Sequence, residues 1–221
     1  MSFKKIASLV LCCLLTIMAM AQKGNGDTLS CYQAHHFGFG QLAVPVSCIT
    51  AASVITSTSL HGQWDKPIRN SIQKDNHKWW HGDNYLQYLP VATPVLLNVC
   101  GVKGKHDLKS LLTMTAASSI VTAIFVNGTK YTARVERPYG DDFNSFPSGH
   151  TATAFMGAEI LRREYGKDYP LIAIAGYGVA ATVGFFRMYN DNHWFSDALA
   201  GAGIGILSAS IAYWLTPYLR F

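Results

Sequence analysis

Three short groups of polar residues in the second half of the chain contain side chains that bind or attack anions. Lysine and arginine neutralise phosphoryl oxygens, the N-terminus of a helix binds anions, and an imidazole beside a carboxylate is an activated nucleophile. Their types and order therefore predict chemistry on a phosphate-like anion. The groups are Lys130 with Arg137 and Pro138, then Pro147, Ser148, Gly149 and His150, and finally Arg187 with His193 and Asp197.

The second group is typical of the junction between a loop and a helix. Ser148 is a favourable N-cap, Gly149 lets the backbone come close to a ligand, and an apolar helical run follows. The first turn of a helix has unpaired N–H groups and a partial positive charge, so it attracts an anion. His150 would lie at the mouth of that pocket.

The other two groups supply cations and a nucleophile. Lys130 and Arg137 follow the end of an apolar helix, where two cations can bind the oxygens of one phosphoryl group. His193 and Asp197 are four residues apart at the start of a predicted helix, so one side of that turn presents both. The carboxylate would fix the tautomer of the imidazole and make its other nitrogen a better nucleophile. Each group alone is common, but the three in this order on one predicted face indicate a site.

Helices must position these groups, because apolar stretches separated by brief polar turns occupy most of the chain from residue 85 onward. The charged fraction is 14%, well below the roughly 25% of a typical soluble domain. We therefore predict an all-α fold, an antiparallel helical bundle with multiple transmembrane helices. Gly201, Gly203 and Gly205 would permit close contact between helices. The apolar stretches are residues 85–102, 108–126, 147–161, 169–186 and 198–219.

Two segments precede the helical core, which we expect at residues 84–221. Residues 1–21 combine an early positive charge, an apolar run and a small-residue cleavage site, which is typical of a signal peptide or an uncleaved signal anchor. Residues 22–83 are interpreted as an outer-face linker and an amphipathic segment. Within them, residues 37–60 are uncharged but contain Pro45, and we expect them to pack on the outer face or to enter the membrane without crossing it.

The distribution of lysine and arginine predicts the orientation of the bundle. Cytoplasmic loops carry an excess of these residues, so the loops around 103–105 and 162–167 are expected inside. The three polar groups then face the periplasm from a bacterial inner membrane. A soluble periplasmic protein is the alternative, favoured by the modest mean hydropathy of +0.14. The net charge is +5 without a basic run interleaved with aromatics, so nucleic acid is not an expected partner.

Taken together, the three groups have the spacing of a known family. They resemble the three signature motifs of the type 2 phosphatidic acid phosphatase and vanadium haloperoxidase superfamily, and the resemblance covers roughly residues 85–219. The motifs are highly specific as a set. One position departs from the family pattern, because Phe186 stands where the family usually has a serine before Arg187.

The resemblance implies how the anion would be bound. Lys130, Arg137 and Arg187 would bind the phosphate oxygens and offset charge in the transition state. Ser148 and the N–H of Gly149 would donate hydrogen bonds to the same oxygens. No metal and no cofactor is implied.

The resemblance also implies the chemical steps. His193 would attack phosphorus and form a phosphohistidine, while Asp197 holds its ring. His150 would protonate the leaving oxygen and later help water to release phosphate.

A membrane lipid phosphate, either a monoester or a pyrophosphate, is the implied substrate. Lipid A, phosphatidylglycerol phosphate, phosphatidate and polyprenyl pyrophosphate are the candidates. The alternatives are a soluble non-specific acid phosphatase of the same fold, a vanadate-dependent haloperoxidase, and a non-catalytic membrane protein that binds phospholipid. The sequence leaves the choice of lipid and the oligomeric state open.

Overall fold

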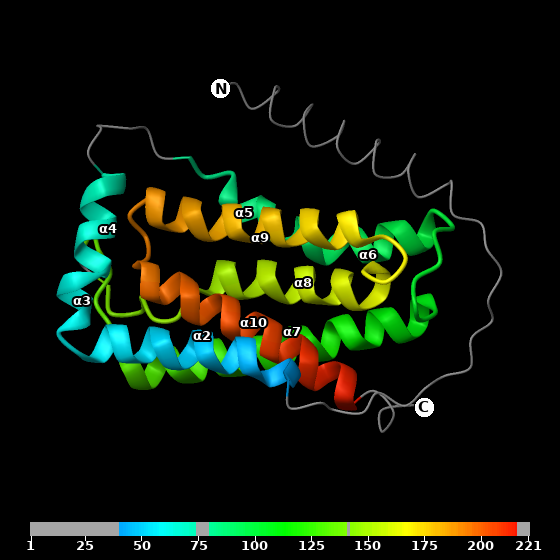
Figure 1. The fold of residues 1–221 in the computed structure, drawn as a ribbon, viewed down its shortest axis with the longest axis horizontal. Helices are drawn as coiled ribbons and strands as arrows, with labels where there is room; N and C mark the ends of the chain where they lie inside the picture. The colour runs from blue at the N-terminus through cyan, green and yellow to red at the C-terminus, as the bar shows by residue number, and fades with distance from the viewer. Residues whose placement is uncertain (1–39, 74–79, 141, 216–221) are drawn as a thin grey trace.

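The structure, a computed structural model, describes residues 40–73, 80–140 and 142–215. The expected signal and most of the expected linker lie outside these residues. Every regular element in the described part is a helix, so the prediction of an all-α fold is confirmed. In Figure 1 the helices are α2 (Gly40–Ser57), α3 (Leu60–Gln63), α4 (Asp65–Ile72), α5 (Asp83–Leu86), α6 (Leu89–Val99), α7 (Leu108–Ala133), α8 (Gly149–Tyr165), α9 (Pro170–Tyr189) and α10 (Phe195–Leu215).

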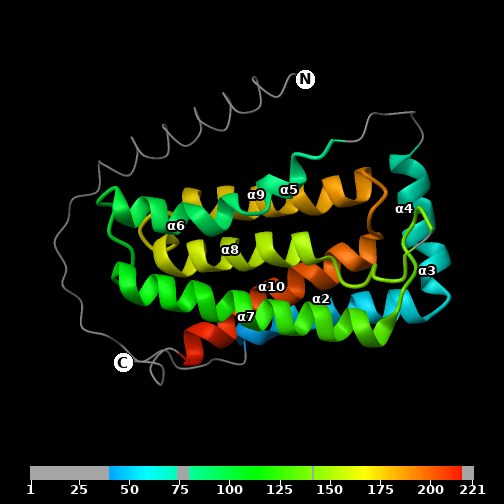
Figure 2. The same ribbon diagram turned by 180° about the vertical axis from the view of Figure 1, so that it is seen from behind.

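The longer helices, α2 and α6 to α10, lie side by side along the long axis and alternate in direction (Figures 1 and 2). α8 lies at the centre and contacts α6, α7, α9 and α10, and α10 also packs against α2. α3 and α4 cross one end of this bundle (Figure 1). The end of α7, the start of α8, the end of α9 and the start of α10 therefore meet at the same end of the molecule.

Capping residues set the ends of α7, which differ from the predicted stretch. Asp107 is the N-cap, and its side chain accepts a hydrogen bond from the backbone N–H of Ser110 at 3.4 Å. Arg134 ends the helix in the left-handed conformation with a φ of 47°. The sequence predicted that Lys130 follows the end of this helix. Because α7 continues to Ala133, Lys130 instead lies within its last turn.

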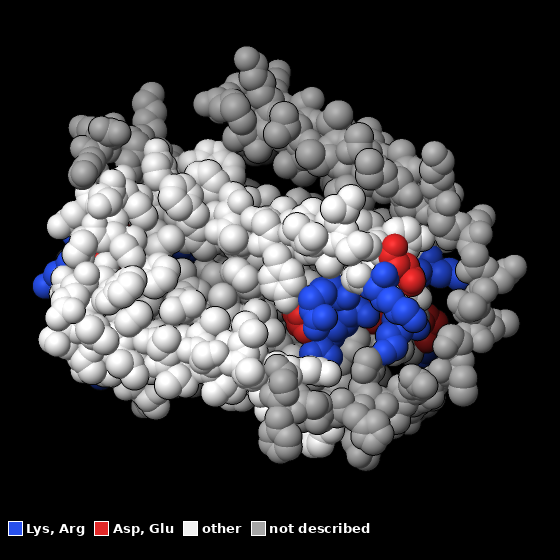
Figure 3. Space-filling view, in the orientation of Figure 1, with Lys and Arg blue, Asp and Glu red and all other residues white. Residues whose placement is uncertain are grey.

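Apolar side chains cover much of the outside of the bundle. α7, α9 and α10 are long and apolar enough to cross a membrane, and Gln41–Ser57 with Leu60–Ile72 meets the same test with a bend of 96° between the two parts. Ile124 and Leu171 are 65% and 67% exposed on this surface. Figure 3 shows one face that is largely uncharged, with Lys and Arg gathered mainly toward the end opposite α3 and α4. Such a surface suits lipid better than water.

Glycines of α10 allow its neighbours to approach closely, as predicted. A Cβ atom added at Gly201 would lie 2.5 Å from the carbonyl oxygen of Ser148, at the start of α8. A Cβ atom at Gly203 would lie 2.7 Å from the carbonyl oxygen of Pro45 in α2. Both distances are too short for a real side chain, so the backbones of α8 and α2 pack directly on α10. The contact at Gly201 brings the starts of α8 and α10 together.

The position of α2 differs from the expectation for residues 37–60. α2 lies lengthwise against α10 and is a member of the bundle (Figure 2). Its first turn lies at the end opposite α3 and α4, where Gln41 Oε1 accepts a hydrogen bond from Arg163 Nη2 at 3.2 Å. The physical reason is that Gly203 has no side chain and lets the backbone of α2 at Pro45 come close to α10, and that α2 carries no charge to bury. Pro45 does not prevent this, because α2 remains helical on both sides of it.

Candidate active site

Loops that connect the four helix ends shape the candidate site. The loop between α7 and α8 is folded by two backbone hydrogen bonds, from Ser145 N to Val135 O at 3.0 Å and from Arg137 N to Asp142 O at 2.9 Å. The loop between α9 and α10 turns tightly, because Asn192 N donates to Arg187 O at 3.0 Å. These two loops bring the three polar groups of the sequence to one place.

Ser148 forms the predicted N-cap of α8. Its Oγ accepts a hydrogen bond from the backbone N–H of Thr151 at 3.4 Å, and its side chain is fully buried. Its own backbone N–H donates to the carbonyl oxygen of Asp197 at 3.0 Å. The N-terminus of α8, with the Gly149 N–H in its first turn, is therefore fastened to the first turn of α10. An anion at this position would meet the positive end of the α8 dipole.

His193 and Asp197 lie next to each other, and both are buried. Nδ1 of His193 is 3.4 Å from Oδ2 of Asp197, which is longer than a well-formed hydrogen bond. Oδ2 also accepts hydrogen bonds from Trp194 N at 2.8 Å and from the Ser145 hydroxyl. Catalytic hydrogen bonds often tighten only when substrate binds, so this spacing suits an orienting carboxylate. The ring nitrogen away from Asp197, Nε2, is left for a ligand.

Burial of His193 favours its neutral form. The pKa of His193 is lowered from 6.5 to about 4, chiefly because burial disfavours the charged imidazolium. Asp197 raises this pKa, whereas the cations Arg187 and Lys130 lower it. The imidazole is therefore unprotonated near pH 7, as a nucleophile must be.

Arg187 is held by a residue that sequence reasoning missed. Its Nη1 donates to Oδ2 of Asp83 at 2.7 Å, and the Asp83 carboxylate is fully buried. Oδ1 of Asp83 accepts a hydrogen bond from Asn190 Nδ2 at 3.3 Å. Asn190 also exchanges two hydrogen bonds with the backbone of Trp80, at 2.6 and 3.0 Å. No motif marks Asp83 in the sequence, because only the packing of α5 beside α9 brings it to Arg187.

Phe186 supports the same arrangement. Its ring lies 4.3 Å from the ring of Trp80, measured between centroids. This contact fixes the segment that leads into α5 and therefore the position of Asp83. Arg187 is thus positioned by its ion pair with Asp83, and Phe186 packs on the segment that leads to Asp83.

His150 and Arg137 complete the site from neighbouring elements. Nε2 of His150 lies 2.9 Å from Oδ1 of Asn84 in α5, and His150 is within electrostatic range of Arg187, His193 and Arg137. Asn84, like Asp83, was not found from the sequence.

Arg137 is fixed by the loops on either side of it. Its Nη1 donates to the carbonyl oxygen of Asn192 at 3.3 Å, and its Nε lies 2.9 Å from Oδ2 of Asp142. Lys130 Nζ donates to the carbonyl oxygen of Asn144. All of the site residues proposed from the sequence therefore lie at this end of the bundle.

α4 braces the loop that carries His193. Asp65 is buried and accepts hydrogen bonds from Ser196 N at 2.9 Å and Ser196 Oγ at 2.7 Å. Arg69 forms a bidentate ion pair with Asp191, with distances of 2.6 and 2.7 Å. The described part of the expected amphipathic segment is therefore a cap over the α9–α10 loop.

The PAP2 superfamily profile matches residues 107–221, which contain all three motifs of the site. The chain belongs to the PAP2 superfamily. This confirms the resemblance inferred from the motifs.

Curated relatives of this PAP2 chain include lipid A 1-phosphatases. One from Porphyromonas gingivalis is 39% identical over 138 residues, which are 62% of this chain and 31% of the relative. One from Helicobacter pylori is 27% identical over 140 residues, which are 58% of this chain and 68% of the relative. The match thus spans about a third of the length of the first of these relatives.

Two solved structures share the fold of this PAP2 chain. The structure of Aquifex aeolicus LpxE has a TM-score of 0.54 and 23% identity, and the match covers 72% of this chain and 98% of that one. A transmembrane PAP2-type phosphatidylglycerolphosphate phosphatase from Bacillus subtilis has a TM-score of 0.57 and 19% identity, with 80% and 98% covered. At these identities the likeness concerns the fold. Together with the apolar helices, it supports a helical membrane protein over the soluble alternative.

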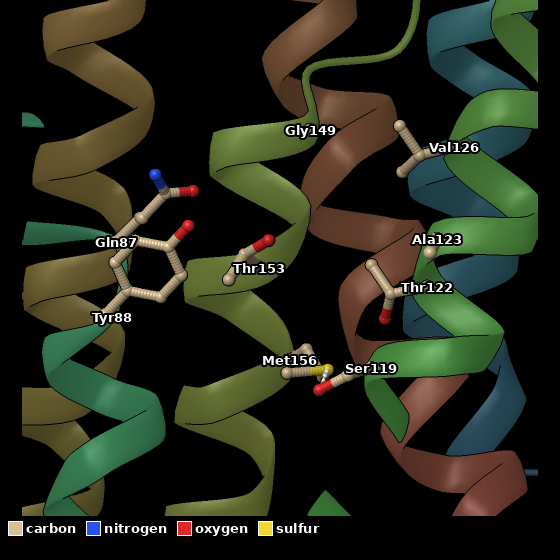
Figure 4. A pocket seen from close by; sticks show the side chains of 9 residues that line it. All are labelled: Gln87, Tyr88, Ser119, Thr122, Ala123, Val126, Gly149, Thr153 and Met156. Atoms are coloured by element: carbon tan, nitrogen blue, oxygen red, sulfur yellow. Dashed lines mark hydrogen bonds between the residues drawn. The ribbon is translucent and has the colours of Figure 1, made fainter. Parts of the chain in front are cut away.

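A cavity of about 280 Å³ adjoins the start of α8 in this PAP2 fold. Figure 4 shows it between α8 and α7, with the start of α6 on its other side. Within the three described ranges, no group of three or more His, Cys, Asp or Glu side chains is placed to hold a metal ion. The cavity is lined by Gln87, Tyr88, Ser119, Thr122, Ala123, Val126, Gly149, Thr153 and Met156.

Proposed function

We propose that the chain is a phosphatase that uses His193 as a nucleophile on a lipid phosphate. The observation that supports this most directly is the contact set of Asp197. Its side chain lies 3.4 Å from the imidazole of His193, and its backbone holds the start of α8 at Ser148. A neutral nucleophile and an anion site are therefore adjacent, and the cations Lys130, Arg137 and Arg187 gather around them.

In the first step, Nε2 of His193 would form a bond to phosphorus as the bond from phosphorus to the lipid oxygen breaks. The electron pair leaves with that oxygen, which takes a proton from the imidazolium of His150. In the free protein His150 is neutral near pH 7, because burial and the nearby Arg187 lower its pKa from 6.5 to about 4. The bound phosphate dianion would raise this pKa, so that His150 takes up a proton together with the substrate. Each positioned donor to the phosphoryl oxygens contributes about 10²–10³ in rate, if magnitudes for oxyanion donors apply.

In the second step, water would release phosphate from the phosphohistidine. The neutral His150 accepts a proton from the water as its oxygen attacks phosphorus. The bond between phosphorus and Nε2 breaks, and the electron pair returns to His193. Both side chains then regain their starting protonation states.

A lipid is the proposed substrate because the site lies at the end of a bundle with an apolar surface. The relatives named lipid A 1-phosphatases make lipid A the first substrate to test. The site residues contact the phosphoryl group, so phosphatidylglycerol phosphate, phosphatidate and polyprenyl pyrophosphate belong in the same panel.

We further propose that the site faces the periplasm. The loop with Lys103 and Lys105 and the turn with Arg163 and Lys167 lie at the opposite end, where excess positive charge favours the cytoplasm. α2 begins at that same end, so Gln41 would be cytoplasmic. A cleaved signal peptide would place the chain from residue 22 onward, including the start of α2, in the periplasm. The proposed orientation, in which α2 starts in the cytoplasm, therefore conflicts with a cleaved signal peptide.

Cysteine labelling on intact cells tests this orientation. In a background without native cysteines, Gly62→Cys at the site end should react with an impermeant maleimide. Gln41→Cys and Lys167→Cys should react only after the membrane is permeabilised. Labelling of Gln41→Cys on intact cells, or a mature protein that begins at residue 22, would contradict the proposed topology.

Phosphate release by the purified protein in detergent tests the activity. The wild type should release phosphate from at least one lipid of the panel without added vanadate, and His193→Ala should reduce release to background. Quenching in alkali, where a phosphohistidine persists, should leave labelled phosphate on the wild-type protein only. Equal release by His193→Ala would refute the assignment. Bromide oxidation that requires vanadate would instead support the haloperoxidase.

A further inference from the structure

We propose that the cavity between α6, α7 and α8 binds the part of the lipid next to the phosphate, and that its hydroxyl acceptors select lipids with hydroxyl or amide N–H donors there. This inference rests on the proposed function and adds the residues that select an N-acylated amino-sugar phosphate from the panel of lipids. Gly149 connects the two regions, because it lies in the first turn of α8 and also lines the cavity. A phosphate at that helix start would therefore direct its attached group into the cavity.

The hydroxyl groups on α7 face this cavity as acceptors. Thr122 Oγ1 donates its proton to Ser118 O at 2.8 Å. Ser119 Oγ donates to Thr115 O at 2.8 Å and lies 3.8 Å from Met156 Sδ, a weaker acceptor. A hydroxyl has one proton to donate, so once it is used only lone pairs remain for a ligand. Both residues line the cavity, and Figure 4 shows them on the α7 side.

Thr153 adds a hydroxyl from α8. It lies one turn beyond Gly149, and Figure 4 shows its side chain directed from α8 toward α7. Its hydroxyl makes no hydrogen bond to any residue within 40–73, 80–140 and 142–215. It can therefore accept a hydrogen bond from a ligand or donate one. The wall thus offers acceptors from two neighbouring helices, α7 and α8.

The surroundings make an unmatched acceptor costly. Thr122 is 5% exposed, and the buried side chains of Val126 and Met156 line the same cavity. In such an apolar setting, a polar group that loses water without gaining a partner is destabilising. A ligand with hydroxyl or amide N–H groups supplies the missing donors. A ligand with only ester oxygens or hydrocarbon at these positions does not.

This chemistry separates the glycolipid from two of the other candidate substrates. The amino sugar of a lipid A-type glycolipid carries hydroxyl and amide N–H groups close to its phosphate. Phosphatidate presents ester oxygens near the phosphate, and a polyprenyl pyrophosphate presents hydrocarbon. The cavity therefore favours the glycolipid over both.

Comparing two lipid phosphates in the same mixed micelles tests the proposal. The substrates are an N-acylated glucosamine disaccharide 1-phosphate and dioleoyl phosphatidate. We expect the wild-type kcat/KM to be at least about tenfold higher for the glycolipid, as two or more added hydrogen bonds of ordinary strength would give. Thr122→Val and Thr153→Val should each lower kcat/KM for the glycolipid by about threefold to tenfold. The ratio of kcat/KM for the glycolipid to kcat/KM for phosphatidate should therefore fall in both variants.

The matched control is Thr113→Val. Thr113 lies on the exposed side of α7 and makes the same type of backbone contact, to Lys109 O at 2.9 Å, but does not line the cavity. Removal of the Thr113 hydroxyl should leave the ratio of kcat/KM between the glycolipid and phosphatidate unchanged. Thr122→Val keeps the shape of the side chain, and the helix N–H of residue 122 still pairs with Ser118 O, so the variant should fold.

The outcomes separate this inference from the proposed function. If neither lipid is hydrolysed by the wild type, the proposed function fails. If both are hydrolysed and phosphatidate is as good a substrate as the glycolipid, the function stands and the selection by hydroxyl acceptors is wrong. Variants that lower both activities by the same factor would also overturn it. A wild-type preference that narrows in the Thr122 and Thr153 variants alone supports it.

Discussion

Arg187 at the end of α9 and Asp83 at the start of α5 form a buried ion pair, with Nη1 2.7 Å from Oδ2 across 104 positions of sequence. Asp83 thereby connects the segment before α6 with a residue of the third motif. Because Arg187 would bind the phosphoryl group, the position of α5 controls how that group is held.

Asp83→Asn should weaken phosphate binding. The amide keeps the size of the carboxylate but removes the charge that orients Arg187, and breaking a buried pair on one side costs about 3–5 kcal/mol. We expect a lower thermal midpoint and a rise in the inhibition constant of inorganic phosphate by about tenfold or more. Asp168→Asn, an exposed carboxylate at the far end, is the control and should change neither quantity. An unaltered inhibition constant in Asp83→Asn would exclude this role.

Gly201→Ala should move the start of α8, which carries Ser148, away from the start of α10, which carries Asp197. The added Cβ would lie 2.5 Å from Ser148 O and 3.2 Å from Ala152 N, so α8 must move away from α10. Activity should fall by at least about tenfold, because displacements near 1 Å in a catalytic arrangement can cost about 10². Gly178→Ala is the matched control, since nothing lies within 4 Å of its added Cβ. That variant should keep full activity and be as stable as the wild type or slightly more so.

The activity should withstand mildly acidic pH, because His193 stays neutral until the pH approaches its lowered pKa. With a pKa of about 4 in the folded protein, the imidazole is neutral at higher pH, so kcat/KM should hold on the acid side until the pH approaches 4. A fall in kcat/KM as the pH is lowered from about 7 to about 5 would show that burial does not depress the pKa of His193.

The same shift predicts how stability depends on pH. The folded pKa lies below the unfolded value of 6.5, so the unfolded chain binds the proton more readily. The stability linked to His193 is present above about pH 6.5 and is lost as the pH falls toward 4. The thermal midpoint of His193→Gln should therefore fall less than that of the wild type across this window. If the thermal midpoints of the wild type and of His193→Gln fell equally between pH 6.5 and about 4, the lowered pKa of His193 would be contradicted.

Asn84→Ala should affect mainly the protonation of the leaving group. Asn84 Oδ1 is the observed partner of His150 Nε2 at 2.9 Å, so its loss leaves the imidazole poorly oriented. We expect a loss of about threefold to tenfold in kcat for a lipid phosphate, the effect of one ordinary hydrogen bond. A p-nitrophenyl ester, whose leaving group needs little protonation, should be affected less. Equal losses on both substrates would indicate a structural role for Asn84 instead.

The helices were largely predictable because their signals are local. Apolar runs and turn residues marked the stretches that became α7 to α10, and Ser148 was recognised as an N-cap from its own neighbours. The stretch at 85–102 was less regular, since it divides into α5 and α6. The end of α7 was placed too early, because its last turn is polar and carries Lys130.

The position of α2 could not be read from its composition. An uncharged segment rich in small residues packs equally well across the end of a bundle or along its side. Contact between Pro45 O and the surface at Gly203 decides between the two, and those residues are far apart in the sequence.

The sequence by itself determined the helical class and the candidate residues of the site, because motif spacing and capping depend on neighbouring residues. Only the tertiary structure decided what holds those residues in place. Asp83 reaches Arg187, Asn84 reaches His150 and Asp65 reaches Ser196 because α4 and α5 pack over the ends of α9, α8 and α10. These pairs depend on which helices meet in space, and no local pattern records that choice.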